Sequence, residues 1–82
     1  MDKVLVKISF PVIEEKHEIW LPTNKKIYSI IMLLLKMLNE LEEAEKSNNM
    51  PSLYNRYTGE CYDMNLRVID TDIKNGTELI LI

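Results

Sequence analysis

His17 and Cys61 are the side chains of this sequence best suited to chemistry, because each is the only residue of its type. A cysteine beside a histidine can act as a nucleophile activated by a general base. Glu60 and Asp63 lie close to Cys61 in the sequence, and neighbouring carboxylates disfavour the reactive thiolate. His17 falls within an alternating segment, on the face predicted to point inward. We therefore expect neither nucleophilic nor redox catalysis.

Other catalytic or ligand-binding sites are also disfavoured. A structural zinc site takes about four ligands at short spacings, and one cysteine with one histidine does not supply them. Asp70 and Asp72 could form an acid–base pair, although a charged, exposed turn explains them more simply. Gly59 and Gly76 are the only glycines, so the sequence holds no glycine-rich phosphate loop. It therefore predicts a protein that is not an enzyme and has no metal or cofactor.

Composition indicates a single folded domain over residues 1–82. Hydrophobic residues make up 46% and charged residues 28%, an ordinary balance for a globular protein. The net charge of −3 gives no basic surface, so nucleic acid is not an expected partner. A single cysteine excludes an internal disulfide and suits a reducing compartment.

The termini and the apolar segments indicate a cytoplasmic protein. The first ten residues, MDKVLVKISF, lack the long apolar stretch and small-residue cleavage site of a signal peptide. The longest apolar run, residues 27–38, is too short to span a bilayer and contains Lys36. We expect no direct membrane insertion.

An N-terminal β-hairpin is predicted from alternation with a period of two. Residues 3–10 alternate strictly, and the inward face holds Val4, Val6, Ile8 and Phe10. Pro11 interrupts the ladder, and residues 17–21 resume the alternation. Leu5 and Trp20 then belong to the outer face.

One long helix is predicted over residues 24–45. Pro22 stops the strand, and Thr23 or Asn24 can cap the helix. Its buried stripe has helical spacing and comprises Ile27, Ile30, Ile31, Leu34, Leu38 and Leu41.

The charges on this predicted helix oppose its dipole. Lys25 and Lys26 fall in its first turn, and Glu42, Glu43 and Glu45 fall in its last turns, where each charge is unfavourable. The acidic stretch from Glu40 to Glu45 is either a solvated helix end or a docking patch for a basic partner segment.

The C-terminal half predicts a short second hairpin and a final strand. Residues 53–57 and 60–62 flank a Thr58-Gly59 turn, and Asn75-Gly76 leads into a strand that reaches Ile82. The economical arrangement is an α+β fold, a mixed sheet of four to five strands wrapped around the helix. The final strand would lie beside the first, with Leu79 and Leu81 in the core.

The order of elements resembles the β-grasp fold of ubiquitin across essentially the whole chain. Leu21-Pro22 followed by Ile27 resembles the strand-to-helix crossover of ubiquitin-like proteins. The closing segment resembles theirs at Val68, Ile73, Asn75-Gly76, Leu79 and Leu81. The most similar group is the bacterial YukD/EsaB family of small ubiquitin-like proteins. This resemblance implies an accessory or regulatory role in type VII (WXG100) secretion, with protein partners from the secretion machinery.

One departure from ubiquitin concerns conjugation. Ubiquitin-like modifiers and sulfur carriers end in a mobile Gly-Gly tail, because glycine lets an activating enzyme approach the backbone closely. This sequence ends at Ile82, inside a predicted strand. We therefore expect a module that is not conjugated. The alternatives are a self-associating structural subunit or homo-oligomer and, less favoured, a modifier or sulfur carrier without the tail.

Four outward apolar residues are the candidate protein-interaction sites: Leu5, Trp20, Ile80 and Ile82. Exposed tryptophans are enriched at binding hot spots, although a Trp20 that lies across the outer face of the sheet or is covered by a loop is an equally simple interpretation. Leu5, Ile80 and Ile82 are predicted to form one apolar patch on adjacent strands.

Overall fold

The predicted N-terminal hairpin is present in the computed structural model, which describes residues 2–82. β1 (Lys3–Phe10) and β2 (Glu15–Pro22) pair antiparallel over their full length, from Lys3 opposite Pro22 to Phe10 opposite Glu15. A 3₁₀ turn, Pro11–Ile13, connects them. Glu14 closes the turn in the left-handed conformation, with φ of 55°.

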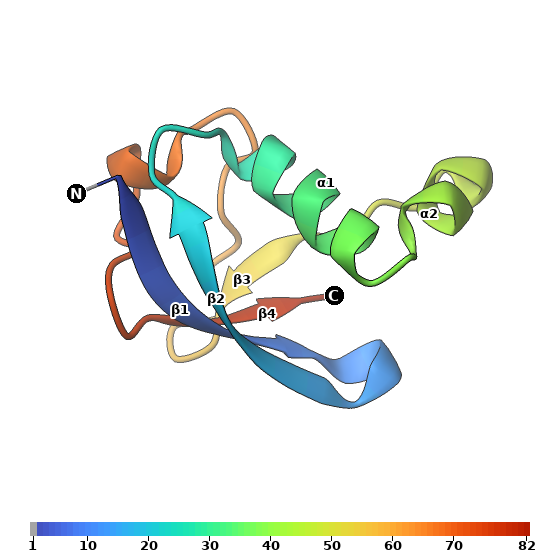
Figure 1. Ribbon diagram of the computed structural model, residues 1–82, viewed down its shortest axis with the longest axis horizontal. Helices are drawn as coiled ribbons and strands as arrows, with labels where there is room; N and C mark the ends of the chain where they lie inside the picture. The colour runs from blue at the N-terminus through green and yellow to red at the C-terminus, as the bar shows by residue number, and fades with distance from the viewer. Residues whose placement is uncertain (1) are drawn as a thin grey trace.

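The described residues form a four-stranded mixed sheet with strand order β2-β1-β4-β3 (Figure 1). β4 (Glu78–Leu81) runs parallel to β1, and Ile8 lies opposite Leu79. β3 (Leu53–Asn55) pairs antiparallel with β4 at the other edge. The prediction that the final strand lies beside the first is therefore confirmed, and an apolar β4 is tolerated because it is paired on both sides.

The predicted second hairpin is reduced to a single bridge between Tyr54 and Cys61. The chain turns immediately after β3, because Asn55 Oδ1 accepts hydrogen bonds from the backbone N–H groups of Tyr57 (2.9 Å) and Thr58 (3.1 Å). An asparagine side chain that binds the backbone two residues later favours a turn over a continued strand.

The prediction of one long helix is wrong, because the segment forms α1 (Ile27–Met37) and α2 (Leu41–Ser47). Asn39 adopts the left-handed conformation, with φ of 60°. The backbone N–H groups of Asn39 and Glu40 then donate to the carbonyls of Lys36 (3.1 Å) and Leu35 (2.8 Å). This pattern ends α1 and satisfies its last carbonyls.

The start of α1 is capped by distant backbone instead of by Thr23 or Asn24. The N–H of Ile27 donates to the carbonyl of Leu66 (2.8 Å), and the N–H of Tyr28 donates to that of Met64 (3.1 Å). Lys26 occupies the N-cap position without a side-chain cap bond. The loop before the second 3₁₀ turn, Val68–Asp70, thus supplies hydrogen-bond acceptors for the first backbone N–H groups of α1, which a local side chain usually caps.

The helix break also corrects the interpretation of the acidic residues. Glu42 and Glu43 lie in the first turn of α2, and Lys46 lies in its last turn. Acids near a helix N-terminus and a base near its C-terminus favour the helix dipole. These residues therefore stabilise α2 instead of opposing a longer helix.

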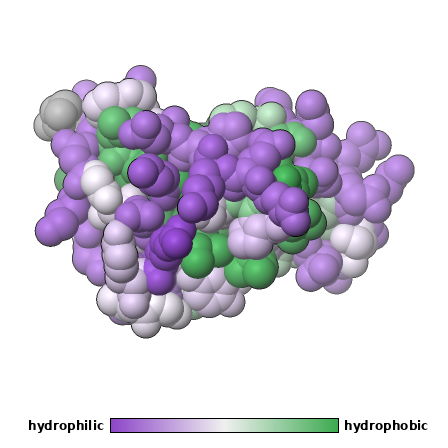
Figure 2. All heavy atoms as spheres, turned by 90° about the horizontal axis from the view of Figure 1, so that it is seen from below, coloured by the Kyte–Doolittle hydropathy of each residue, from purple (hydrophilic) through white to green (hydrophobic). Residues whose placement is uncertain are grey.

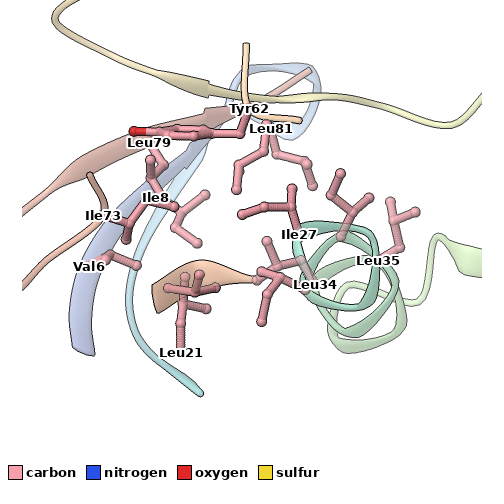
Figure 3. Packing of buried hydrophobic residues seen from close by; sticks show 14 of the residues in the cluster. Val6, Ile8, Leu21, Ile27, Leu34, Leu35, Tyr62, Ile73, Leu79 and Leu81 are labelled. Atoms are coloured by element: carbon pink, nitrogen blue, oxygen red, sulfur yellow. The ribbon is translucent and has the colours of Figure 1, made fainter. Parts of the chain in front are cut away.

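The core lies between the inner face of the sheet and α1 (Figure 3). β1 and β4 contribute alternate residues, and α1 contributes its apolar stripe. The most deeply buried large side chains are Val6, Ile8, Ile27, Ile30, Ile31, Leu53, Val68 and Leu79. Leu81 is also buried, whereas Leu38, at the end of α1, is only partly buried.

Candidate protein-interaction surfaces

Leu5 and Trp20 form a cross-strand pair on the outer face of the sheet. They are register partners in the β1–β2 hairpin, and Trp20 is 54% exposed. Such an aromatic–aliphatic pair contributes about 0.2–1 kcal/mol to the sheet. At this exposure the indole is not covered by a loop, whereas the interpretation that it lies across the outer face of the sheet, beside Leu5, fits the structure.

The backbone of Leu5 is held by the loop that leads into β4. The N–H of Leu5 donates a hydrogen bond to the Asn75 side-chain oxygen (2.8 Å), and the carbonyl of Leu5 accepts one from the N–H of Gly76 (2.8 Å). Gly76 has φ of 89°, a conformation that favours glycine. The Asn75-Gly76 turn therefore holds in place the backbone of β1 next to Trp20.

A row of charged side chains crosses the outer face beside this pair. Lys7 is the register partner of both Glu18 on β2 and Glu78 on β4. Glu78 also lies 3.9 Å from Arg56 and accepts a hydrogen bond from the Tyr57 hydroxyl. That hydrogen bond is the main cause that lowers the pKa of Glu78 and raises the pKa of Tyr57.

The prediction of one apolar patch on the outer face is wrong. Ile80 lies opposite Ser9 and Tyr54, whereas Leu5 is level with Gly76. Four residues along a strand correspond to about 13 Å, and the charged row occupies that interval. Figure 2 shows apolar atoms in separate groups with hydrophilic atoms between them.

Ile82 belongs to a different surface from Leu5 and Trp20. The N–H of Ile82 donates to the carbonyl of Ser52 (3.0 Å), and the carbonyl of Ile82 accepts from the N–H of Ser52 (2.8 Å). Its side chain is 57% exposed and lines a groove at the end of the domain. The four candidate residues are therefore divided among three separate surfaces. Leu5 and Trp20 form one, Ile80 lies in a second, and Ile82 lines this groove.

The groove, here called the end groove, has a volume of about 260 Å³. It lies between the β1–β2 turn, the end of α1, α2 and the last residues of the chain. Its lining comprises Phe10, Val12, Ile13, Leu35, Leu38, Glu40, Glu43, Ala44, Ser47, Asn49, Pro51, Leu81 and Ile82. Of these residues, only Ile82 and the acidic stretch are predicted from the sequence to take part in binding, and Phe10, Leu38 and Leu81 are predicted only as core residues. Asn39 in the middle of the predicted helix was the available signal, because asparagine tolerates the left-handed conformation.

The structure does not bring His17 and Cys61 together. His17 lies on β2, where its Nε2 is 2.8 Å from Glu15 Oε1 and its ring packs edge-on against Phe10. Cys61 lies beside β3. β2 and β3 are the two edges of the sheet, so three strand spacings, about 14 Å, separate them.

Asp70 and Asp72 each have a different partner. Asp70 lies 3.1 Å from Arg67 Nε, and Asp72 Oδ1 accepts a hydrogen bond from the Tyr62 hydroxyl at 2.7 Å. Burial, followed by this hydrogen bond, raises the pKa of Tyr62 to about 12. The Tyr62 oxygen also accepts a bond from Asn55 Nδ2 at 3.1 Å, so this cluster ties β3 to the loop before β4.

Residues 2–82 contain no group of three or more histidine, cysteine, aspartate or glutamate side chains placed to hold a metal ion. Within the same residues, neither helix has the length and apolar character needed to cross a membrane.

Solved structures similar to this chain include ubiquitin-like domains, one of which comes from a type VII secretion system protein. A further similar structure is the "MycP5-free ESX-5 inner membrane complex, State II", at 14% identity and a TM-score of 0.77, covering 100% of this chain. This chain spans only 21% of the length of that one. The EccD5 ubiquitin-like domain from Mycobacterium xenopi is 18% identical, with a TM-score of 0.75 and coverage of 100% and 94%.

The ubiquitin-like domain of the Mycobacterium tuberculosis type VII secretion protein ECCD1 is also similar. It is 14% identical, with a TM-score of 0.70 and coverage of 100% of this chain and 99% of that chain. Neither a protein-family profile nor a curated protein sequence matches this chain. These likenesses confirm the ubiquitin-like β-grasp fold that the sequence predicts.

Proposed function

We propose that this chain is a ubiquitin-like protein-interaction module of a type VII-like secretion machine and acts by noncovalent binding. The observation that carries the proposal is the likeness, over the whole chain, to ubiquitin-like domains of type VII secretion proteins. Membership of the bacterial YukD/EsaB family, an accessory or regulatory role and a cytoplasmic location are part of the same proposal.

The Leu5–Trp20 pair supports binding through the outer face of the sheet. α1 packs against the opposite face, so the outer face keeps its tryptophan accessible (Figure 1). A tryptophan at the centre of an interface often contributes 2 kcal/mol or more to binding. The row of Glu18, Lys7 and Glu78 beside it carries both signs of charge and would set the orientation of the partner.

We further propose that the chain does not act as an enzyme. The wide separation of His17 and Cys61 supports this, because a base has to lie within hydrogen-bond reach of the nucleophile that it activates. Asp70 and Asp72 are likewise engaged by Arg67 and Tyr62.

Copurification with the secretion machinery tests the function. The tagged chain would be produced in its own organism, and the membrane complex of the type VII-like system would be isolated in mild detergent. We expect the chain in the purified complex at a fixed ratio to the membrane components. A chain that stays free of the complex under all conditions would contradict the proposal.

Two substitutions locate the binding face in the same assay. Trp20→Ala should reduce recovery of the chain at least tenfold. Ile69→Ala is the control, since Ile69 is 60% exposed but lies on the 3₁₀ turn Val68–Asp70. Equal recovery of Trp20→Ala and the unaltered chain would exclude the Leu5–Trp20 surface.

Self-association through the free edge of β2 is disfavoured. β2 carries Glu15, Lys16, His17 and Glu18 in succession, and charges on an edge strand oppose pairing with another chain. Light scattering at rising concentration tests it, with a monomer expected throughout.

A further inference from the structure

The end groove is a second candidate binding surface, built by the break between α1 and α2. The left-handed Asn39 redirects the chain, and α2 then extends beyond the end of the sheet, near the β1–β2 turn and the C-terminus (Figure 1). Ala44 is the buried residue of α2. Because its side chain is one methyl group, a hollow remains where a larger residue would fill the space.

Much of the groove wall is apolar and open to solvent. Val12, on the β1–β2 turn, is 85% exposed, and Ile82, at the other end of the chain, is 57% exposed. Leu38, which also lines the groove, is only partly buried against the core. Apolar side chains gathered around a concavity favour an apolar occupant, because its binding removes their surface from water.

The size of the groove favours a peptide side chain over a small-molecule cofactor. Sites for drug-sized ligands are about 300–1,000 Å³, and the end groove has about 260 Å³. A volume of this order receives one or two large apolar side chains. Helix-in-groove and related peptide complexes use anchors of this kind.

The charged groups of the groove favour a partner that carries positive charge. Glu40 and Glu43 are the only charged side chains that line it. Within residues 2–82 neither forms an ion pair, whereas Glu42, on another side of α2, pairs with Lys46 at 3.8 Å. Two unpaired carboxylates beside an apolar hollow attract a cation and repel an anionic lipid surface or nucleic acid.

We propose that the end groove binds a peptide segment of a partner protein that carries one or two large apolar side chains next to lysine or arginine. The apolar side chains enter the hollow between Val12 and Ile82, and the cations pair with Glu40 and Glu43. This inference goes beyond the proposed function, since the groove is distinct from the Leu5–Trp20 surface.

Selection from a random peptide library tests the inference. The folded chain would be used to select from displayed 12-residue peptides, and enriched peptides would be synthesised and titrated into the ¹⁵N-labelled chain. We expect enrichment of apolar residues beside lysine or arginine, and the largest amide shifts around Val12, Ala44 and Ile82. No enrichment, or shifts centred on Trp20, would overturn the proposal.

A matched pair of double variants tests the charge pairing. Glu40→Lys with Glu43→Lys reverses the groove charges and should weaken peptide binding at least tenfold. Glu42→Lys with Glu45→Lys makes the same change in net charge on α2 outside the groove lining, and should weaken it less than threefold. Equal losses would show attraction to net charge alone and overturn the proposed site.

Two further variants keep the result interpretable. Val12→Ser removes an exposed wall residue with little effect on folding, and should weaken binding at least threefold even if the groove charge reversal disturbs α2. Trp20→Ala should leave peptide affinity unchanged, which separates this site from the proposed secretion function. A dimer in light scattering that Val12→Ser dissociates would show that a second copy of the chain occupies the groove, and would also overturn the proposal.

Discussion

Ile8 and Leu79 lie opposite each other across the parallel β1–β4 pair, and both side chains are completely buried. This contact joins the first and last strands of the chain. Contacts of such sequence separation require a large loss of chain entropy before they form. The stability of the domain therefore depends strongly on the inward residues of β4.

Leu79→Ala should lower the free energy of unfolding by about 2–5 kcal/mol, because it leaves a cavity in the centre of the core. Denaturation in urea, followed by Trp20 fluorescence, measures the loss. Ile80→Ser is the control on the neighbouring, partly buried position and should cost about 1 kcal/mol. A larger loss for Ile80→Ser than for Leu79→Ala would contradict the assigned faces of β4.

The charged row separates the Leu5–Trp20 pair from Ile80 on the outer face. The effects of mutations at these two regions on the free energy of unfolding should therefore be independent. Leu5→Ala and Trp20→Ala remove one contact between register partners and should show a coupling energy of about 0.5 kcal/mol or more. Leu5→Ala combined with Ile80→Ala should be additive within about 0.3–0.5 kcal/mol. A double-mutant cycle of urea unfolding measures both couplings, and strong Leu5–Ile80 coupling would support the single patch instead.

The break between the helices depends on Asn39. Asn39→Ala should destabilise the domain by about 1–2 kcal/mol, because alanine is strained in the left-handed conformation. Asn39→Gly should be neutral or stabilising. Asn49→Ala, at an exposed position without positive φ, controls for loss of an amide in thermal melts. Equal melting temperatures for Asn39→Ala and Asn39→Gly would refute a conformational role.

Tyr62 should make the domain sensitive to alkaline pH. Its pKa is raised from 10.0 to about 12 in the folded chain, so the native state retains the phenolic proton longer than the unfolded state. The associated stability is complete below pH 10 and is lost as the pH rises from 10 to 12. Urea unfolding at pH 8, 10 and 11 should show a steeper loss for the unaltered chain than for Tyr62→Phe. Parallel pH profiles would contradict the assignment.

Cys61→Ser and His17→Gln should each leave copurification with a partner unchanged, provided that the variant melts at the same temperature. Cys61 is exposed and His17 contacts Glu15 and the Phe10 ring, so neither is required for the proposed binding. A folded Cys61→Ser protein that lost partner binding would indicate that the Cys61 thiol has a functional role.

The amino-acid sequence alone determined the hairpin, the buried stripe of α1 and the inward face of β4. Each of these follows from a local period, since alternate residues of a strand and every third or fourth residue of a helix share one face. The Asn75-Gly76 turn is local in the same sense, and it identified the start of the last strand.

Tertiary structure decided the helix break, the capping of α1 and the outline of the surfaces. Residues 24–45 read as one helix because their stripe continues past Asn39, but α1 is capped by the carbonyls of Leu66 and Met64, which lie far along the chain. The alternation of β4 predicts that Ile80 points outward, yet only the parallel register places it opposite Ser9 and away from Leu5. The end groove likewise joins residues from both ends and the middle of the chain. Such neighbours are set by long-range packing, on which a local period carries no information.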